Sequence, residues 1–475
     1  MQFDLKASVL KPLSLVIASL LITACTSTAV QKPDIHYADN YSVGSPQSDS
    51  ETIAVDSRWW QSFQSVALNE LMQAAAQQSP DLLISTERVK QAELQMRIAN
   101  ASLFPSLSAS ASSGESRSKP DGGSNTRSES TRVGANISYE VDLWGGIAAE
   151  RTSAKAGYEA TRYDQDAATL SVKAAIASGW FQWLALQERI ATAHKNIAIA
   201  ERVQKIVDAR YKNGAATAAD VAQQKTNLLT QRSSLLPLEL QARQTQSALA
   251  ILLGKTPQEF SLAAEKLLVM KVPQIAAGTP ADLVTRRPDL AASEADLRAA
   301  SANIHAARAA LLPGISLGAN AGKTASELFS LNPATQTSGW TLSLAQTLFN
   351  GGRLVNQKRL SEARQSELLL QYHKAILMAL QEVDNALVAA DISQRQETSQ
   401  LEIVANAERS LRLTEARYRA GTDDLLSLLD AQRSLFQAQD SLVLQRLSRL
   451  NAAVDLYKAL GGGWQLAQQD AEKVN

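Results

Sequence analysis

Four short stretches of the chain alternate between apolar and polar positions, the pattern of a β-strand with one apolar face. In RVGANISYEVDLW, at 132–144, every second side chain is apolar, and weaker versions occur at about 105–112, 314–321 and 338–349. Strands of about 9 to 11 residues suit a transmembrane barrel, although a half-buried soluble sheet shows the same period. The alternation alone therefore predicts four strands and leaves their surroundings open.

Very long segments poor in glycine and proline follow the paired strands. Residues 353–420 contain neither residue type and would form a helix roughly 100 Å long at about 1.5 Å per residue. Apolar residues in this segment follow the four-three spacing of a coiled-coil seam. Gly157, Gly179 and Pro237 interrupt the earlier segments, where we expect bends rather than helix ends. The long helices are predicted at about 146–213, 215–254, 352–420 and 422–460.

The chain is also internally duplicated. PDLLISTERV at Pro80 matches PDLAASEADL at Pro288, 208 residues later, and ARYKNG at 209–214 matches ARYRAG at 416–421, 207 residues later. Each copy has the same order of helix, two strands around a polar loop, and two long helices. The predicted divisions are a signal peptide at 1–24, an extended lipidated segment at 25–58, a first repeat at 59–270, a second repeat at 271–460 and a tail at 461–475.

The twin hexapeptides end in Gly214 and Gly421, between two long helices in each copy. Glycine tolerates the left-handed conformation in which helices often end. Each glycine therefore marks the predicted tip of a helical hairpin.

The amino terminus predicts secretion. Lys6 and Lys11 precede an apolar run about half as long as the roughly 20 residues that a membrane-spanning helix needs. The run ends in LITAC, where Cys25 is the chain's only cysteine. This stretch resembles the lipobox of bacterial lipoproteins, which implies a covalent lipid on Cys25; an ordinary signal peptide with an incidental cysteine is the alternative. Because one acyl chain anchors only marginally, stable attachment would need several.

Net charge and short motifs argue against nucleic-acid binding, hydrolysis and metal binding. Basic and acidic residues number 47 each, so net charge gives no electrostatic reason to expect nucleic acid as a partner. GISLG fits a hydrolase pattern around Ser316, but that serine lies within an alternating strand instead of a strand-to-helix turn. The four histidines, His305 among them, lack metal-site spacing. We expect no enzyme, no metal and no cofactor apart from the lipid.

Several long motifs resemble the outer-membrane factor (TolC-like) family, most closely its OprM-like lipoprotein branch of multidrug efflux channels. The chain departs from that pattern at His305, where a small residue is usual, and at ATAADVAQQK, a loose version of the first tip. The motifs are WWQSF (59–63), VDLWGG (141–146), RRPDLAASEADLRAA (286–300), LFNGGR (348–353), ARYRAGTDDLLSLLDAQRSLFQAQ (416–439) and LYKALGGGW (456–464).

The resemblance implies an α+β membrane protein of the cell outer membrane. Its homotrimer would close four transmembrane β-strands per chain into a 12-stranded barrel, and its long α-helical hairpins would form a periplasmic α-barrel. Four strands cannot close alone, since single barrels start at about eight. The hairpin tips at Gly214 and Gly421 would dock a periplasmic adaptor protein and an inner-membrane RND-type pump, and the channel would export drugs or other small toxic compounds. The alternative is a periplasmic adaptor lipoprotein, which has one hairpin flanked by compact β domains.

The resemblance also implies a gated periplasmic end. Asp430 matches an aspartate of the constriction, Leu426 an apolar ring position, and Arg417 with Tyr418 the residues that tie adjacent hairpins. Ser427 stands where some members carry a second carboxylate, so a double ring is in doubt. Three symmetry-related Asp430 side chains would repel one another and attract cations. The alternatives are a solvated helix-face carboxylate at Asp430 and, at Arg417, a cation favoured by a helix C-terminus.

Overall fold

The structure is a computed structural model that describes residues 38, 41–42, 55–275 and 278–465. The predicted signal peptide and Cys25 lie outside the described residues.

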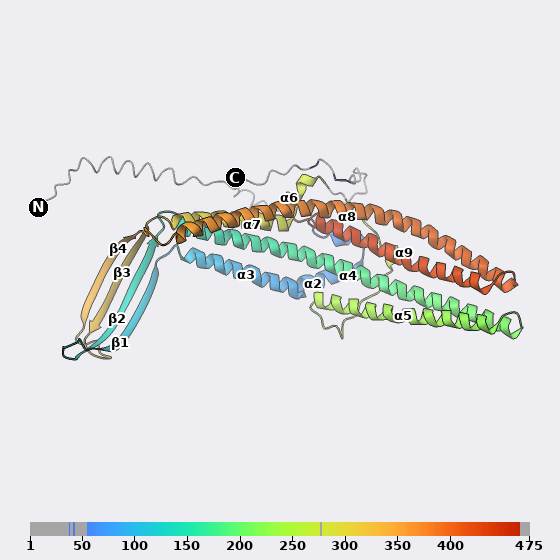
Figure 1. The fold of residues 1–475 in the computed structure, drawn as a ribbon, viewed down its shortest axis with the longest axis horizontal. Helices are drawn as coiled ribbons and strands as arrows, with labels where there is room; N and C mark the ends of the chain where they lie inside the picture. The colour runs from blue at the N-terminus through green and yellow to red at the C-terminus, as the bar shows by residue number, and fades with distance from the viewer. Residues whose placement is uncertain (1–37, 39–40, 43–54, 276–277, 466–475) are drawn as a thin grey trace. The chain divides into compact units, whose positions relative to one another are not determined.

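Four antiparallel strands form one sheet in the order β1-β2-β3-β4 (Figure 1). The central pair, β2 and β3, joins the two repeats, with Val141 opposite Ile315 and Thr131 opposite Ala325. The predicted sheet of four strands is therefore confirmed. Their bounds are β1 (Ser106–Ser118), β2 (Thr126–Val141), β3 (Gly314–Ala325) and β4 (Thr335–Ala345).

The first hairpin of the sheet is longer than the predicted strands at 105–112 and 132–144, because β1 and β2 extend into the stretch predicted as a polar loop. In the extension Glu115 lies opposite Glu129 and Arg117 opposite Arg127. Arg127 pairs with Glu115 at 3.1 Å and with Glu129 at 2.7 Å. Cross-strand charge pairs thus replace the apolar alternation, which is why the period of two did not reveal these residues.

At the opposite end of the sheet the strands predicted to reach 144 and 349 stop earlier, at Val141 and Ala345. Ala345 lies opposite Gly314, and the preceding Pro313 has no N–H with which to continue the ladder. Asp142 leaves the sheet because its carboxylate accepts N–H groups from the first turn of the next helix, at 3.1 and 2.7 Å.

Long helices make up most of the rest of the described chain. The two longest, of 67 and 68 residues, are each about 100 Å long at about 1.5 Å per residue. None of the described helices combines the length and apolar composition that crossing a membrane requires. The helices are η2 (Trp59–Phe63), α2 (Val66–Gln78), α3 (Pro80–Ala101), α4 (Gly146–Lys212), α5 (Ala218–Leu252), η3 (Leu267–Val269), η4 (Pro280–Asp282), α6 (Leu283–Arg286), α7 (Pro288–Ala309), α8 (Arg353–Ala420) and α9 (Leu425–Ala459).

The interruptions in the first repeat do not end its helices. Helix α4 continues through Gly157 and Gly179, and α5 continues through Pro237. A Cβ atom at position 179 would lie 2.9 Å from a terminal carbon of Leu249, so this glycine lets α5 approach α4 closely. Nothing lies within 4 Å of the corresponding point at Gly157.

Matching glycines close the two repeats. Gly254 follows α5 and Gly461 follows α9, both at positive φ. An added Cβ would lie 2.3 Å from the carbonyl oxygen of Gln78 at the first and 1.9 Å from that of Arg286 at the second. Each carbonyl stands two residues before the proline that begins α3 or α7. The same backbone contact, between glycines 207 residues apart and carbonyls 208 residues apart, confirms the internal duplication.

The main apolar cluster brings the two ends of the described chain together. Trp59 of η2 stacks on Tyr457 of α9 at a ring-centroid distance of 5.1 Å, and Phe63 packs on Phe181 at 5.0 Å. Trp180 is fully buried in the same cluster. Burying aromatic side chains of this size stabilises the middle of the helical layer strongly.

Candidate membrane surface and gate

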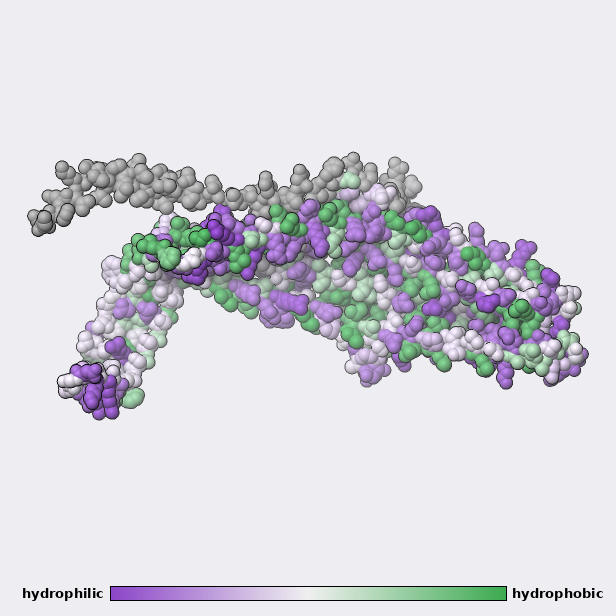
Figure 2. Space-filling view, viewed as in Figure 1, coloured by the Kyte–Doolittle hydropathy of each residue, from purple (hydrophilic) through white to green (hydrophobic). Residues whose placement is uncertain are grey.

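One face of the sheet is apolar and exposed. Leu107 lies opposite Ile137, Ile137 opposite Ala319, and Ala319 opposite Trp340, so one row of side chains crosses all four strands. The large side chains of this row are exposed, Trp340 to 77%. Figure 2 shows hydrophilic residues gathered instead at the turn between β1 and β2. An exposed apolar band that ends in a polar turn suits a surface facing lipid.

The two outer strands of the sheet have free edges. Within the described chain β1 pairs only with β2, and β4 only with β3. A free edge beside an apolar face is a template for another strand. In hydrocarbon, each unpaired backbone group would also cost several kcal/mol. The sheet is therefore incomplete as a membrane structure until β1 and β4 find partners.

The two long hairpins, α4–α5 and α8–α9, have matching tips (Figure 1). Gly214 has φ +72° and Gly421 φ +80°. In each tip the N–H after the glycine donates to the carbonyl of the hexapeptide arginine, at 2.8 Å in the first and 3.0 Å in the second. Thr217 caps α5, and the carboxylate of Asp424 caps α9 by accepting an N–H at 2.7 Å. These hydrogen bonds and helix caps make both tips well-defined turns.

Tyr418 joins the two hairpins within one chain. Its side chain is 3% exposed and belongs to an apolar cluster with Val203 and Val207 of α4 and Leu428 of α9. Burial raises the pKa of Tyr418, and Asp220 raises that pKa further, whereas the Arg210 guanidinium lowers it.

Arg210, which sequence reasoning missed, is the polar partner of Tyr418. Its guanidinium carbon lies 4.6 Å from the centre of the Tyr418 ring, and its Nη1 donates to the Tyr418 carbonyl oxygen. A cation over an aromatic ring is attracted by the ring's negative face. The available signal was the repeat itself, because Arg210 occupies in ARYKNG the place of Arg417 in ARYRAG.

A second missed contact lies two turns of α4 before Arg210. Arg202 donates to both carboxylate oxygens of Glu415 on α8, at 3.2 Å each. Arg419 adds a bond to the same buried carboxylate at 2.6 Å. Bidentate arginine–carboxylate pairs fix geometry as well as charge. Together with Tyr418, this pair holds α4 against α8 near the tips.

The other predicted gate residues lie outside this junction. Leu426 and Asp430 are exposed on α9, and their spacing of four residues puts them on one face of the helix. Asp430 forms an ion pair with Arg433 of its own helix. The exposed side chain of Arg417 lies 3.6 Å from Asp423 and does not share the Tyr418 cluster. The roles of these residues in a gate stay predictions.

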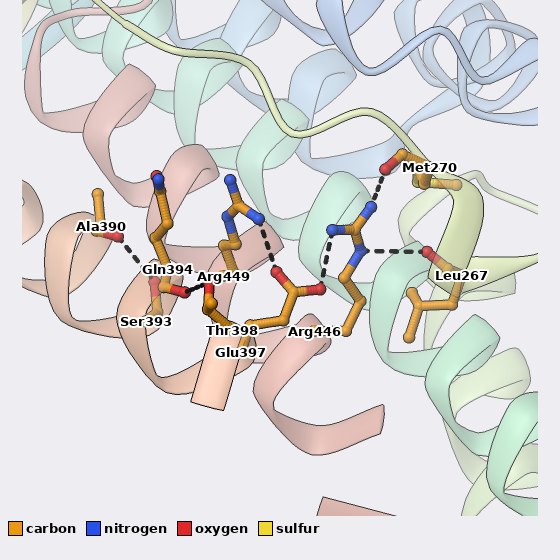
Figure 3. A network of polar contacts seen from close by, with 9 residues as sticks. All are labelled: Leu267, Met270, Ala390, Ser393, Gln394, Glu397, Thr398, Arg446 and Arg449. Carbon is orange, nitrogen blue, oxygen red and sulfur yellow. Dashed lines mark hydrogen bonds and ion pairs between the residues drawn. The ribbon is translucent and has the colours of Figure 1, made fainter. Parts of the chain in front are cut away.

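A buried charge network connects the segment between the repeats to the second hairpin (Figure 3). Glu397 of α8 accepts from Arg446 at 2.9 Å and from Arg449 at 2.7 Å, both on α9. Arg446 also donates to the carbonyl oxygens of Leu267, at 3.4 Å, and Met270. One arginine therefore satisfies backbone carbonyls on the connecting segment while its charge is balanced by α8.

The described residues contain no cluster of three or more potential metal ligands. Ser316 lies within β3, opposite Glu140 and Ser343, so no strand-to-helix elbow presents it.

Comparison with known proteins gives the family. A family model described as "Outer membrane efflux protein" matches residues 71–255 and 279–462, close to the two repeats. The pyoverdine export outer membrane protein OpmQ of Pseudomonas putida is 40% identical over 459 residues, covering 94% of this chain and 96% of that protein. Outer membrane protein OprJ of Pseudomonas aeruginosa is 32% identical over 461 residues, covering 95% of each.

The fold has solved counterparts. The structure of the outer-membrane channel OprN matches with a TM-score of 0.82 at 25% identity, over 93% of this chain and 100% of that one. The match covers both the sheet and the helices of this chain. An adaptor, with one hairpin and compact β domains, would not match a channel in this way. The adaptor alternative is therefore wrong.

Proposed function

The chain belongs to the outer membrane efflux protein family, and on this premise we propose that it is the trimeric exit duct of a tripartite pump. It is an outer-membrane efflux channel and not an enzyme, and its family uses no cofactor. The proposed partners are a periplasmic adaptor and an inner-membrane RND-type pump, which would supply the energy.

The incomplete sheet carries the proposal of a trimer. Four strands with an exposed apolar face and two free edges cannot form a closed barrel alone. Three chains supply about twelve strands, within the range of known membrane barrels. Closure would pair β4 of one chain with β1 of the next and leave no edge in lipid.

The proposed gate lies on the uncovered face of α9. No described element of the chain covers Leu426 or Asp430, which leaves both free to face the axis of a trimer. Three leucines would form an apolar constriction, and three aspartates one turn away would attract cations to it. Gly214 and Gly421 would present the tips to the adaptor or pump.

The lipid on Cys25 remains part of the proposal. A lipobox-like sequence supports it, and Cys25→Ser should abolish the acyl mass seen on the mature chain by mass spectrometry. An unmodified cysteine in the mature wild-type protein would refute it.

The names of the relatives support small organic compounds as cargo. They include pyoverdine export, antibiotic efflux and toluene efflux proteins. We propose drugs or other small toxic compounds as the class, with a siderophore as the second candidate because the pyoverdine protein is 40% identical.

The test combines oligomeric state with conductance. Protein extracted from outer membranes should migrate as a trimer on native gels and form channels in planar bilayers. Asp430→Ala should raise single-channel conductance or open probability, whereas Asp391→Ala, which removes an exposed carboxylate of α8, should change neither. A monomer that does not sediment with outer membranes would refute the duct, and unchanged conductance in Asp430→Ala would refute the gate residue alone.

A further inference from the structure

The residues that join the two repeats near the tips have equivalents, one repeat away in the sequence, that do not contact each other within the described part of one chain. Near the tips α4 holds α8 through Arg202 with Glu415 and through Arg210 with Tyr418. Each of these four residues has an equivalent in the other repeat, 207 residues later or earlier in the sequence, which we call its twin. The twin pairs are Arg409 with Asp208, and Arg417 with Tyr211. The twins preserve the chemistry, a guanidinium with a carboxylate and a guanidinium with a tyrosine ring.

The twin residues lie on the far side of each helix. At about 100° per residue, the mean direction of Arg202 and Arg210 around α4 differs by roughly 170° from that of Asp208 and Tyr211. Because the offset is constant, the same angles apply to their counterparts around α8. Each helix therefore carries one set of contact residues toward the other repeat and a second set facing away from it.

The second set is available in one chain. Tyr211 is 49% exposed, and the side chain of Arg417 is 66% exposed, with one long ion pair of 3.6 Å to Asp423 of its own tip. Arg409 is exposed and forms no ion pair with any residue that the structure describes. Among the described residues, Asp208 accepts one neutral bond, from Gln204 of its own helix at 2.9 Å, and forms no ion pair. The first set, by contrast, is engaged in the contacts described above.

We propose that neighbouring copies of this chain join at their tips through this second set. Arg409 pairs with the partner subunit's Asp208, and Arg417 lies over the ring of the partner subunit's Tyr211. The inference rests on the proposed trimer, in which six hairpins alternate around a ring. The ring then has six junctions between hairpins, three within chains and three between chains. Each junction has the same two contacts, a guanidinium with a carboxylate and a guanidinium with a tyrosine ring.

The junction between copies is the more polar of the two kinds. Val203 and Val207, which are fully buried against the second hairpin, have Ser410 and Thr414 as their twins. Charge and cation–ring contacts therefore carry the tip junction between copies without an apolar cluster behind them. Exposed ion pairs are screened by salt, so these junctions weaken as ionic strength rises, while the junctions within a chain, which have an apolar cluster behind them, weaken less.

Crosslinking in outer membranes tests the arrangement. With Asp208→Cys and Arg409→Cys in one chain, a short bismaleimide should convert monomer bands on denaturing gels into dimer and trimer bands. Each single variant should stay monomeric, which also controls for Cys25. The matched control pairs Asp208→Cys with Arg395→Cys, an exposed position on α8 about 21 Å from Arg409; it should not crosslink.

Charge exchange gives an independent readout. Arg409→Asp should speed dissociation of the purified trimer at low salt by about tenfold or more, since three repulsive pairs act together. Adding Asp208→Arg should restore the wild-type rate, and high salt should remove the difference. Additive effects of the two changes would overturn the pairing.

The outcomes separate this inference from the function on which it rests. Native gels showing intact trimers without a crosslink between positions 208 and 409 would overturn the junction and leave the duct standing. Native gels showing only monomers would overturn the duct itself.

Discussion

The network around Glu397 predicts a large loss of stability from one small change. Glu397→Gln removes one charge and keeps nearly the same volume. The side chains of Glu397 and Arg446 are 8% and 10% exposed, so water cannot replace the lost partner. Arg446 would remain buried with its charge unbalanced, because the acceptors left to it, the amide oxygen at position 397 and the carbonyl oxygens of Leu267 and Met270, are all neutral.

Breaking one side of a buried ion pair typically costs about 3 to 5 kcal/mol. Arg449 is less buried than Arg446 and can turn toward solvent, which places the expected loss near the lower limit, at about 3 kcal/mol. Replacing Arg446 by Met in the same chain should recover only part of it, up to about 1 kcal/mol, because the unbalanced charge is removed but its hydrogen bonds are lost too. The two carbonyls would then lack their donor, at a cost of about 1 kcal/mol or more each.

Guanidinium titration of the detergent-solubilised protein, followed by tryptophan emission, would measure the effect as a lower midpoint at unchanged slope. Trp180 lies in the main apolar cluster and reports on this part of the helical layer. Asp391→Asn is the matched control, because it breaks the exposed pair with Arg395 and should cost about 0.5 kcal/mol or less.

A loss below about 1 kcal/mol in Glu397→Gln would refute the reasoning, because an exposed pair would give the same value. The reasoning would also be refuted if Glu397→Gln alone were as stable as the double variant Glu397→Gln with Arg446→Met, or more stable.

Three further predictions concern the tips and the helix contact. Arg210→Leu should raise channel conductance in bilayers because it removes the cation and the donor that hold Tyr418, and Arg210→Lys should have a smaller effect; equal conductance of all three proteins would contradict this. Hydrogen bonds from the first turn of α9 lower the pKa of Asp424 below 3.8, so its stabilisation is present at neutral pH and is lost as pH falls through that lowered pKa. Asp424→Asn should flatten this acid dependence in thermal melts, and an unchanged profile would refute the capping role. Gly179→Val should lower the melting temperature by several degrees because it meets Leu249, while Gly157→Val should not; equal shifts would show that helix propensity alone is measured.

Periodicity predicted the strands, long segments without glycine or proline predicted the helices, and the repeated hexapeptides with their glycines predicted the tips. It failed where polar residues take over a structural role, as in the paired ends of β1 and β2, where Glu115 and Arg127 continue the sheet. A charged strand has no apolar period to detect. The strand ends at Val141 and Ala345 were missed for a related reason, since a proline and a capping aspartate on neighbouring segments determine them.

The candidate site was predictable in part. Its glycines and Tyr418 stand in motifs, whereas Arg210, Arg202 and Glu415 act through partners more than two hundred residues away in sequence. Single residues read along the chain cannot reveal such pairs. Aligning the two repeats brings them out, because a contact made in one repeat has a twin in the other.

The free edges of the sheet bear on how the protein is made. A newly exported chain carries an apolar surface and two unsatisfied rows of backbone groups through an aqueous compartment. In the proposed trimer, strand pairing between chains and entry into lipid must then happen in one concerted step, since either alone leaves polar backbone in oil or apolar side chains in water. Until that step, each chain needs a holdase or a short transit time to escape aggregation.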